Sequence, residues 1–186
     1  MTEPVDGAVL VDIARESIRE HLGLARVTER HEPWLLQPAA TFVTLREQGD
    51  LRGCIGSLDA RRPMGLDVAH NARAAAFSDP RFPPVARDEV DALDVEVSLL
   101  SAREPVAVTS EADALSKLRP GIDGVYFEYG AASATFLPQV WESLPDPRVF
   151  LAELRRKAGL SARFWHPDVK LSRYTVEKFR DERPGS

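Results

Sequence analysis

The fold of this chain is decided by residues 41–57, which read Thr-Phe-Val-Thr-Leu-Arg-Glu-Gln-Gly-Asp-Leu-Arg-Gly-Cys-Ile-Gly-Ser. The first part, 41–46, is rich in β-branched residues, which favour strands. Residues 47–50 are typical of a turn, and 51–58 predict the partner strand. The segment is therefore predicted to be a β-hairpin.

The second strand of this hairpin holds the single cysteine, Cys54, close to Arg52, Gly53 and Gly56. Two glycines in a strand cost stability and indicate that another group approaches the backbone closely. Because side chains alternate along a strand, we expect Arg52, Cys54 and Gly56 to share one face. A thiol beside a cation is a candidate thiolate, whereas a buried free cysteine is more often a small hydrophobic residue.

The rest of the sequence predicts helices interleaved with strands. Apolar residues at helical spacing predict a helix over 7–22 with Asp6 as its N-cap. Further patterns predict a helix over 63–77, a strand over 93–100, a short helix from 110, a hairpin of 125–129 and 134–137, a helix over 146–159, and a final strand over 169–179. Hairpins dominate over βαβ units. We therefore expect an α+β fold with a mainly antiparallel twisted sheet and flanking helices.

The composition excludes several classes of protein. The net charge of −5, from 24 basic and 29 acidic residues, makes nucleic-acid binding an unfavoured function. One cysteine permits neither an internal disulfide nor a multi-cysteine zinc site, which suits the cytoplasm. The sequence shows no secretory leader and no apolar run of the roughly 20 residues that a membrane helix needs. We expect a cytoplasmic protein without a membrane partner, with one domain over 1–183 and a frayed tail at 184–186.

Two further regions supply candidate site residues. His70, on the predicted second helix, is a candidate general base for Cys54, although a solvated helix-face histidine is the simpler interpretation. The proline-rich loop 78–84 holds Asp79, Arg81 and Phe82. These residues form either the wall of a site or an internal Asp79–Arg81 pair that only shapes the turn.

Glu96 is the remaining acidic candidate, and it lies on the alternating strand 93–100. It could act as a general base, bind Arg52 across strands, or lie exposed to solvent. The sequence contains no phosphate-binding glycine loop, no dinucleotide fingerprint and no His-Glu-x-x-His motif, and its four histidines are dispersed. It therefore identifies no cofactor and no metal site.

Several stretches together resemble the AMMECR family. They are the 42–45 strand leading to 51–56, and the segments 79–84, 96–100, 121–124, 134–140 and 170–174. The resemblance implies an α+β domain of two intertwined subdomains with the cysteine motif in the cleft between them. It also implies a likeness to protein A of the prokaryotic AmmeMemoRadiSam system, with Memo-type and radical S-adenosylmethionine proteins as pathway partners. The family pattern does not include His70.

Two hypotheses of function remain. The first is a small-molecule enzyme or pathway component with Cys54 as nucleophile or thiol ligand. Its substrate-binding residues would be Arg52, Gly53, Gly56, Ser57, His70, Asp79, Arg81, Phe82 and Glu96. The second is a non-catalytic module that binds a protein or a metabolite and has a structural cysteine.

Overall fold

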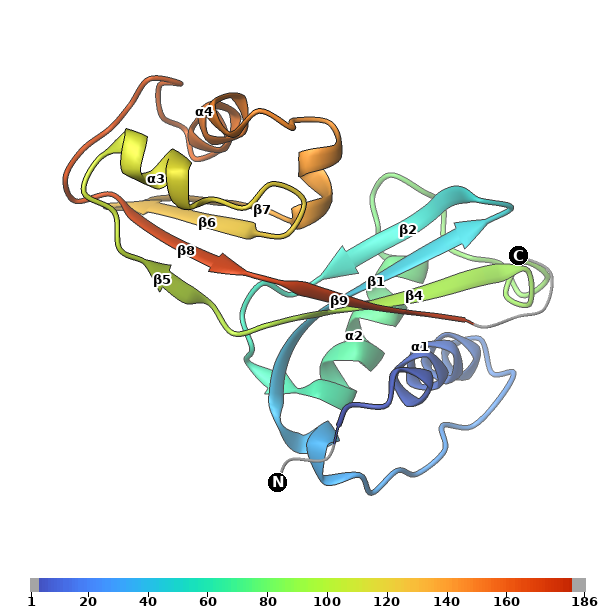
Figure 1. The fold of residues 1–186 in the computed structure, drawn as a ribbon. Helices are drawn as coiled ribbons and strands as arrows, with labels where there is room; N and C mark the ends of the chain where they lie inside the picture. Colours follow the sequence, from blue (N-terminus) through green and yellow to red (C-terminus); the bar gives the residue numbers. More distant parts are fainter. Residues whose placement is uncertain (1–3, 182–186) are drawn as a thin grey trace. The chain divides into compact units, whose positions relative to one another are not determined.

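The computed structural model describes residues 4–181, which form two compact units (Figure 1). The first unit comprises residues 4–100 and 177–181, and the second is Ser101–Val176. Each unit has its own antiparallel sheet and its own helices, so the predicted α+β class is confirmed, with two sheets in place of one. The tail predicted at 184–186 lies outside the described residues.

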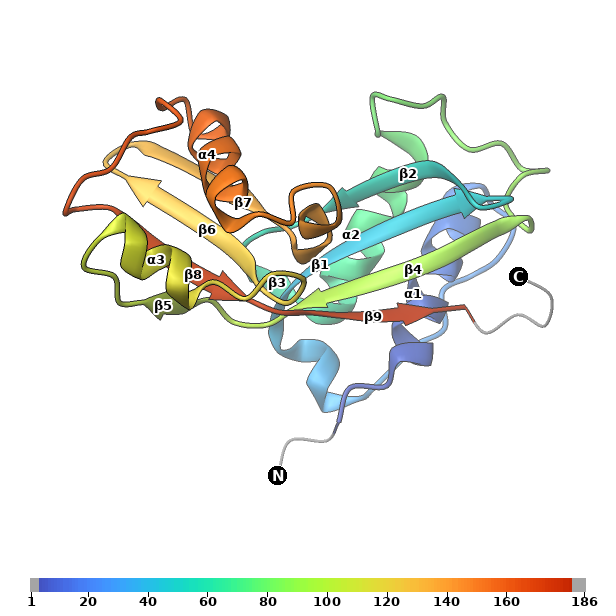
Figure 2. The ribbon, with the colours of Figure 1, turned by 45° about the horizontal axis from the view of Figure 1, so that its top comes forward.

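The first unit is built on a sheet with the strand order β2-β1-β4-β9, and β3 pairs with β1. Its elements are α1 (Gly7–His21), η1 (Pro33–Leu36), β1 (Pro38–Glu47), β2 (Asp50–Gly56), β3 (Arg62–Pro63), α2 (Met64–Phe77), β4 (Leu93–Leu100) and β9 (Val176–Arg180). Helices α1 and α2 pack against each other and lie on the same side of this sheet (Figures 1 and 2).

Local sequence explains the ends of α1. The Asp6 carboxylate accepts a hydrogen bond from the backbone N–H of Ala8 at 2.9 Å, as an N-cap does. Gly23 follows the helix with a φ of +69°, a left-handed conformation that glycine adopts without steric cost. The apolar stripe between these ends packs into the core of the unit, together with α2 and the inner face of the sheet.

The inner face of this sheet carries the alternation that the sequence predicted. Val43 and Leu45 of β1 and Val95 and Val97 of β4 are at most 2% exposed. The intervening residues Phe42, Thr44 and Glu96 are half-buried on the opposite face. One face of the sheet is therefore closed by helices, and the other carries polar side chains together with the ring of Phe42.

The second unit has the strand order β5-β8-β6-β7. Its elements are β5 (Glu104–Val106), α3 (Glu111–Lys117), β6 (Gly124–Tyr129), β7 (Ala132–Phe136), η2 (Pro138–Glu142), α4 (Pro147–Lys157) and β8 (Lys170–Tyr174). Trp141 stacks on Phe150 with ring centroids 3.6 Å apart, and its indole N–H donates to the carbonyl of Asp123 at 2.7 Å. This aromatic pair anchors η2 and α4 in the core of the unit.

The predicted single strand over 169–179 is wrong in one respect. It is two strands, β8 in the second sheet and β9 in the first. Thr175 separates them, and its N–H donates to the Ser101 hydroxyl while its carbonyl accepts from the Ser101 N–H. The chain thus leaves the first unit after Leu100 and returns to it at Glu177.

Candidate functional site

The candidate site is built around Cys54 on β2. Cys54 is a free cysteine that is partly exposed, and it pairs with Thr44 of β1. Thr44 in turn pairs with Glu96 of β4, so these three side chains form one row on one face of the sheet. The Thr44 hydroxyl lies 3.3 Å from the Cys54 sulfur, within hydrogen-bond distance.

Asp79 fixes the backbone of Cys54 from the turn that follows α2. Its carboxylate accepts a hydrogen bond from the Cys54 N–H at 2.9 Å. It also accepts from the Arg81 side chain, through Nε at 2.9 Å and Nη2 at 2.7 Å, and from the Arg81 N–H at 3.1 Å. These bonds hold the pKa of Asp79 well below its usual range. The largest contribution comes from the Arg81 guanidinium and smaller ones come from the two backbone N–H groups, and together they outweigh the opposing effect of burial.

Arg81 is the cation in contact with Cys54. Its Nη2 donates to the Cys54 carbonyl at 3.1 Å as well as to Asp79. Its pKa is raised, mainly by the hydrogen bond to Asp79 and to a smaller extent by the interaction with Cys54. The side chain is 54% exposed, and its Nη1 donates to none of the residues that the structure describes. Arg81 therefore holds a positive charge beside Cys54 that faces solvent on one side.

Arg52 has a different position from the one predicted. The pairing of β1 with β2 shifts between Leu45, which faces Gly53, and Arg46, which faces Leu51. Arg52 therefore has no partner on β1, and the alternation of side chains between the two faces of the strand is interrupted at this residue. The guanidinium that meets Cys54 is that of Arg81, not that of Arg52.

Instead, Arg52 anchors the loop between α2 and β4. Its Nη1 donates to the carbonyl of Pro83 at 2.8 Å, and its Nε and Nη2 each lie 3.1 Å from a carboxylate oxygen of Glu89. Arg52 lowers the pKa of Glu89, with help from the Ala86 N–H. This loop contains Asp79 and Arg81, so the bonds of Arg52 support the site indirectly.

The two glycines of the motif are explained by the packing of the first unit. A side chain at Gly53 would collide with the backbone carbonyl of Ala75 in α2. A side chain at Gly56 would collide with the ring of Phe42. The sequence indicated that another group approaches the backbone here, and the groups that do so belong to the chain itself.

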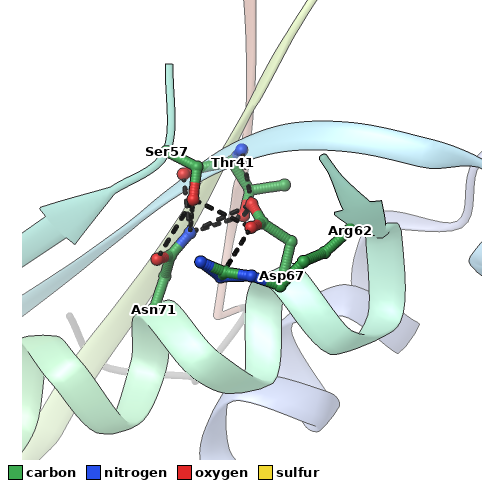
Figure 3. A network of polar contacts seen from close by, with 5 residues as sticks. All are labelled: Thr41, Ser57, Arg62, Asp67 and Asn71. Atoms are coloured by element: carbon green, nitrogen blue, oxygen red, sulfur yellow. Dashed lines mark hydrogen bonds and ion pairs between the residues drawn. The ribbon is translucent and has the colours of Figure 1, made fainter. Parts of the chain in front are cut away.

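Ser57 belongs to a separate polar network, shown in Figure 3. Its hydroxyl donates to Asp67 at 2.8 Å and accepts from the Asn71 amide at 3.2 Å. Asp67 also accepts from the N–H and the hydroxyl of Thr41 and from Arg62. This network ties α2 to β1 and to the end of the hairpin.

The structure places the three remaining candidates, His70, Phe82 and Glu96, in different surroundings. His70 is an exposed residue of α2, and no described hydrogen bond links it to Cys54. Phe82 is half-buried, with the Arg81 guanidinium 5.5 Å from its ring centroid. Glu96 lies on the Cys54 face, but it pairs with Lys178 at 3.7 Å and with Arg180, both on β9. Of the alternatives that the sequence left open for Glu96, the contact with Arg52 is therefore excluded, because Arg52 binds Glu89.

Thr44 is the site residue that sequence reasoning missed. Its position opposite Cys54 could not be read from the sequence, because a regular register from the turn would place Val43 there. Within residues 4–181, no three His, Cys, Asp or Glu side chains are grouped in a way that could hold a metal ion. In the same range, no helix combines the length and apolar character that crossing a membrane requires.

Together, the fold and the site define an α+β protein with a cysteine, an aspartate and an arginine joined at the edge strand of its first sheet. A model of the AMMECR1 family matches residues 11–179. The chain therefore belongs to the AMMECR1 family, as the resemblance of its motifs indicated.

Relatives and a solved structure agree with this assignment. A protein of Methanothermobacter thermautotrophicus is 39% identical over 186 residues, covering 95% of each chain. A protein of Thermococcus gammatolerans is 40% identical and covers 96% of this chain and 91% of its own. The crystal structure of an uncharacterized protein from Pyrococcus horikoshii has a TM-score of 0.81 at 37% identity, covering 96% of this chain and 92% of that one.

Proposed function

We propose that this protein is a small-molecule enzyme or pathway component in which Cys54 reacts with or holds an anionic substrate. The proposal rests on one observation: Asp79 binds the backbone of Cys54 and at the same time holds the half-exposed Arg81 guanidinium at that residue. A positive charge next to a thiol favours the thiolate, which is the nucleophilic form. The free Nη1 of Arg81 is suited to bind a carboxylate or phosphate of the substrate.

In this proposal each residue has a separate task. Thr44 positions the sulfur through its hydroxyl, and Asp79 positions both the Cys54 backbone and Arg81. Arg52 is a positioning residue, because it acts through the loop that carries Asp79 and Arg81. Following the family resemblance, we also propose that the protein acts alongside Memo-type and radical S-adenosylmethionine proteins.

Alkylation with a charged and a neutral reagent tests this proposal. Iodoacetate and iodoacetamide attack the same thiol, but only iodoacetate carries a carboxylate that Arg81 can attract. We expect Arg81→Ala to lower the iodoacetate-to-iodoacetamide rate ratio of the native protein about fivefold, the effect of one partly exposed charge pair. Mass spectrometry of the Cys54 peptide gives both rates.

The controls for this test lie on the same loop. Arg81→Lys keeps the charge and should retain part of the ratio, and Arg87→Ala removes an exposed arginine and should leave it unchanged. A thiol that reacts only after unfolding, or a ratio that Arg81→Ala does not alter, would contradict the proposal.

A second candidate function, a binding module with a structural cysteine, is favoured by a different observation. Among the residues that the structure describes, no histidine or carboxylate forms a hydrogen bond with the Cys54 sulfur, whose neutral partner is the Thr44 hydroxyl, so no general base stands beside the thiol. If this function is correct, Cys54→Ser leaves pathway activity intact, while reversal of the Arg81 charge abolishes ligand binding. Loss of activity in a stably folded Cys54→Ser protein would favour the enzyme.

A further inference from the structure

The second unit contains a groove between α3, α4 and the segment 162–163. Its volume is about 570 Å³, within the range of roughly 300–1,000 Å³ that is typical of small-molecule sites. Three arginines line it, Arg148 and Arg155 from α4 and Arg163 from the following segment. Glu111 of α3 is the only acidic residue in the lining, so the groove carries an excess of positive charge.

Arg155 forms the floor of this groove. The residue is only 2% exposed, and its Nη1 donates to Glu111 and to the carbonyl of Phe164, each at 2.8 Å. Its Nε is buried and has no hydrogen-bond partner among the residues that the structure describes. A buried donor without a partner is unusual in a folded protein, because the loss of its bonds to water is not compensated.

Arg148 and Arg163 differ from Arg155 in exposure and in hydrogen bonding. Both are exposed, and neither side chain forms an ion pair or hydrogen bond within residues 4–181. Glu111 offsets the charge of Arg155, and no described carboxylate offsets the other two. The other residues of the lining are apolar and include Leu115 and Ala152.

We propose that this groove binds a small organic oxyanion, a molecule with a phosphate or carboxylate group and a short apolar part. Arg148 and Arg163 bind the oxyanion by charge-assisted hydrogen bonds, and Leu115 and Ala152 contact the apolar part. Arg155, held by Glu111 and the Phe164 carbonyl, supplies a fixed positive charge beneath it. This site uses no residue of the Cys54 site and does not depend on the function proposed for it.

The test is a titration of the full ¹⁵N-labelled chain with phenyl phosphate, followed by backbone amide shifts. We expect saturable shifts in 111–115, 148–155 and 162–163. We expect Arg148→Ala and Arg163→Ala each to weaken binding about fivefold, as for one partly exposed charge-assisted bond. Both side chains are exposed, so these variants should fold.

The matched control is Arg156→Ala, which removes the next arginine of α4. Arg156 pairs with Glu153 and does not line the groove, so its loss should leave the affinity unchanged. Phenol, which lacks the phosphate, should produce much smaller shifts at the same concentration. The proposal is overturned if phenol shifts the same residues equally, if the shifts never saturate, or if Arg156→Ala weakens binding as much as Arg163→Ala.

Discussion

Asp67 and Asp79 are two buried aspartates of the first unit with similar immediate partners. Each side chain is 2% exposed, and each accepts a hydrogen bond from a backbone N–H of the 41–57 hairpin. Each also pairs with an arginine that reaches solvent, Arg62 for Asp67 and Arg81 for Asp79.

The two clusters differ in the groups that complete them. Around Asp67, the side chains of Thr41, Ser57 and Asn71 donate and accept among themselves. Around Asp79, the neighbours are a partly exposed thiol and a guanidinium with a free Nη1. A buried carboxylate is therefore no sign of a site by itself. Of the two clusters, the one around Asp79 is the one that sets a partly exposed thiol beside its half-exposed guanidinium.

The largest expected effect is that of Asp67→Ala. It leaves the buried N–H and hydroxyl of Thr41 without their acceptor and removes one acceptor of the Asn71 amide, so the free energy of unfolding should fall by about 4 kcal/mol. Urea unfolding measures this loss. Asp88→Ala, which removes an exposed carboxylate, is the control and should change stability by less than about 0.5 kcal/mol.

Should Asp67→Ala fail to fold, Asp67→Asn keeps the shape and should still cost about 2 kcal/mol. The native Asp67→Asn protein should retain the Cys54 alkylation rate of the parent. A changed rate with little loss of stability would mean that the two clusters are not distinct in function.

Asp79→Asn should have a smaller effect on stability that depends on pH. The folded-state pKa of Asp79 lies below its ordinary value of 3.8, so its carboxylate stabilises the fold above about pH 4. This contribution is lost as the pH falls below that value. We expect Asp79→Asn to cost about 2 kcal/mol at pH 7, with the difference narrowing under acidic conditions.

Urea titrations at pH 7 and at about pH 3 measure this difference. The same variant should lower the iodoacetate-to-iodoacetamide ratio, because Arg81 loses the carboxylate that holds it. If the loss of stability in Asp79→Asn were the same at both pH values, the charge of Asp79 would not contribute to the free energy of unfolding.

The smallest effects come from a matched pair of hydroxyl deletions. Ser57→Ala removes a donor to Asp67 and should cost about 1 kcal/mol without affecting Cys54. Thr44→Val keeps the shape of the side chain but removes the hydroxyl at the sulfur. It should therefore change the rate at which Cys54 is alkylated, with a loss of stability smaller than that of Ser57→Ala. If Ser57→Ala changed the alkylation rate and Thr44→Val did not, the Asp67 cluster and not the Asp79 cluster would be the one that acts on the thiol.

Much of the fold follows from local sequence. Asp6 and Gly23 bound α1 as predicted, and the alternation of 93–100 places Val95 and Val97 in the core. The division of the final strand could not be predicted, because both halves carry strand-like patterns. Only their pairing, β8 with β5 and β6, and β9 with β4, assigns them to different sheets.

The residue of β1 that lies opposite Cys54 likewise could not be predicted from the sequence. The two-residue turn at Gln48 and Gly49 pairs Glu47 with Asp50, and a regular count from there would place Val43 opposite Cys54. The irregularity at Arg52 moves Thr44 into that position. One extra residue in a strand changes which side chain faces the thiol, and the sequence carries no clear sign of it.

The sequence by itself determined that residues 41–57 form a hairpin, that Cys54 lies on it, and that its glycines permit close packing. The tertiary structure decided which cation meets the thiol. Arg52, two residues from Cys54, is drawn to Glu89, whereas Arg81, 27 residues away, reaches Cys54. The reason is physical: alternation fixes directions only along a regular strand, and a returning loop brings its charges to positions that no local pattern records.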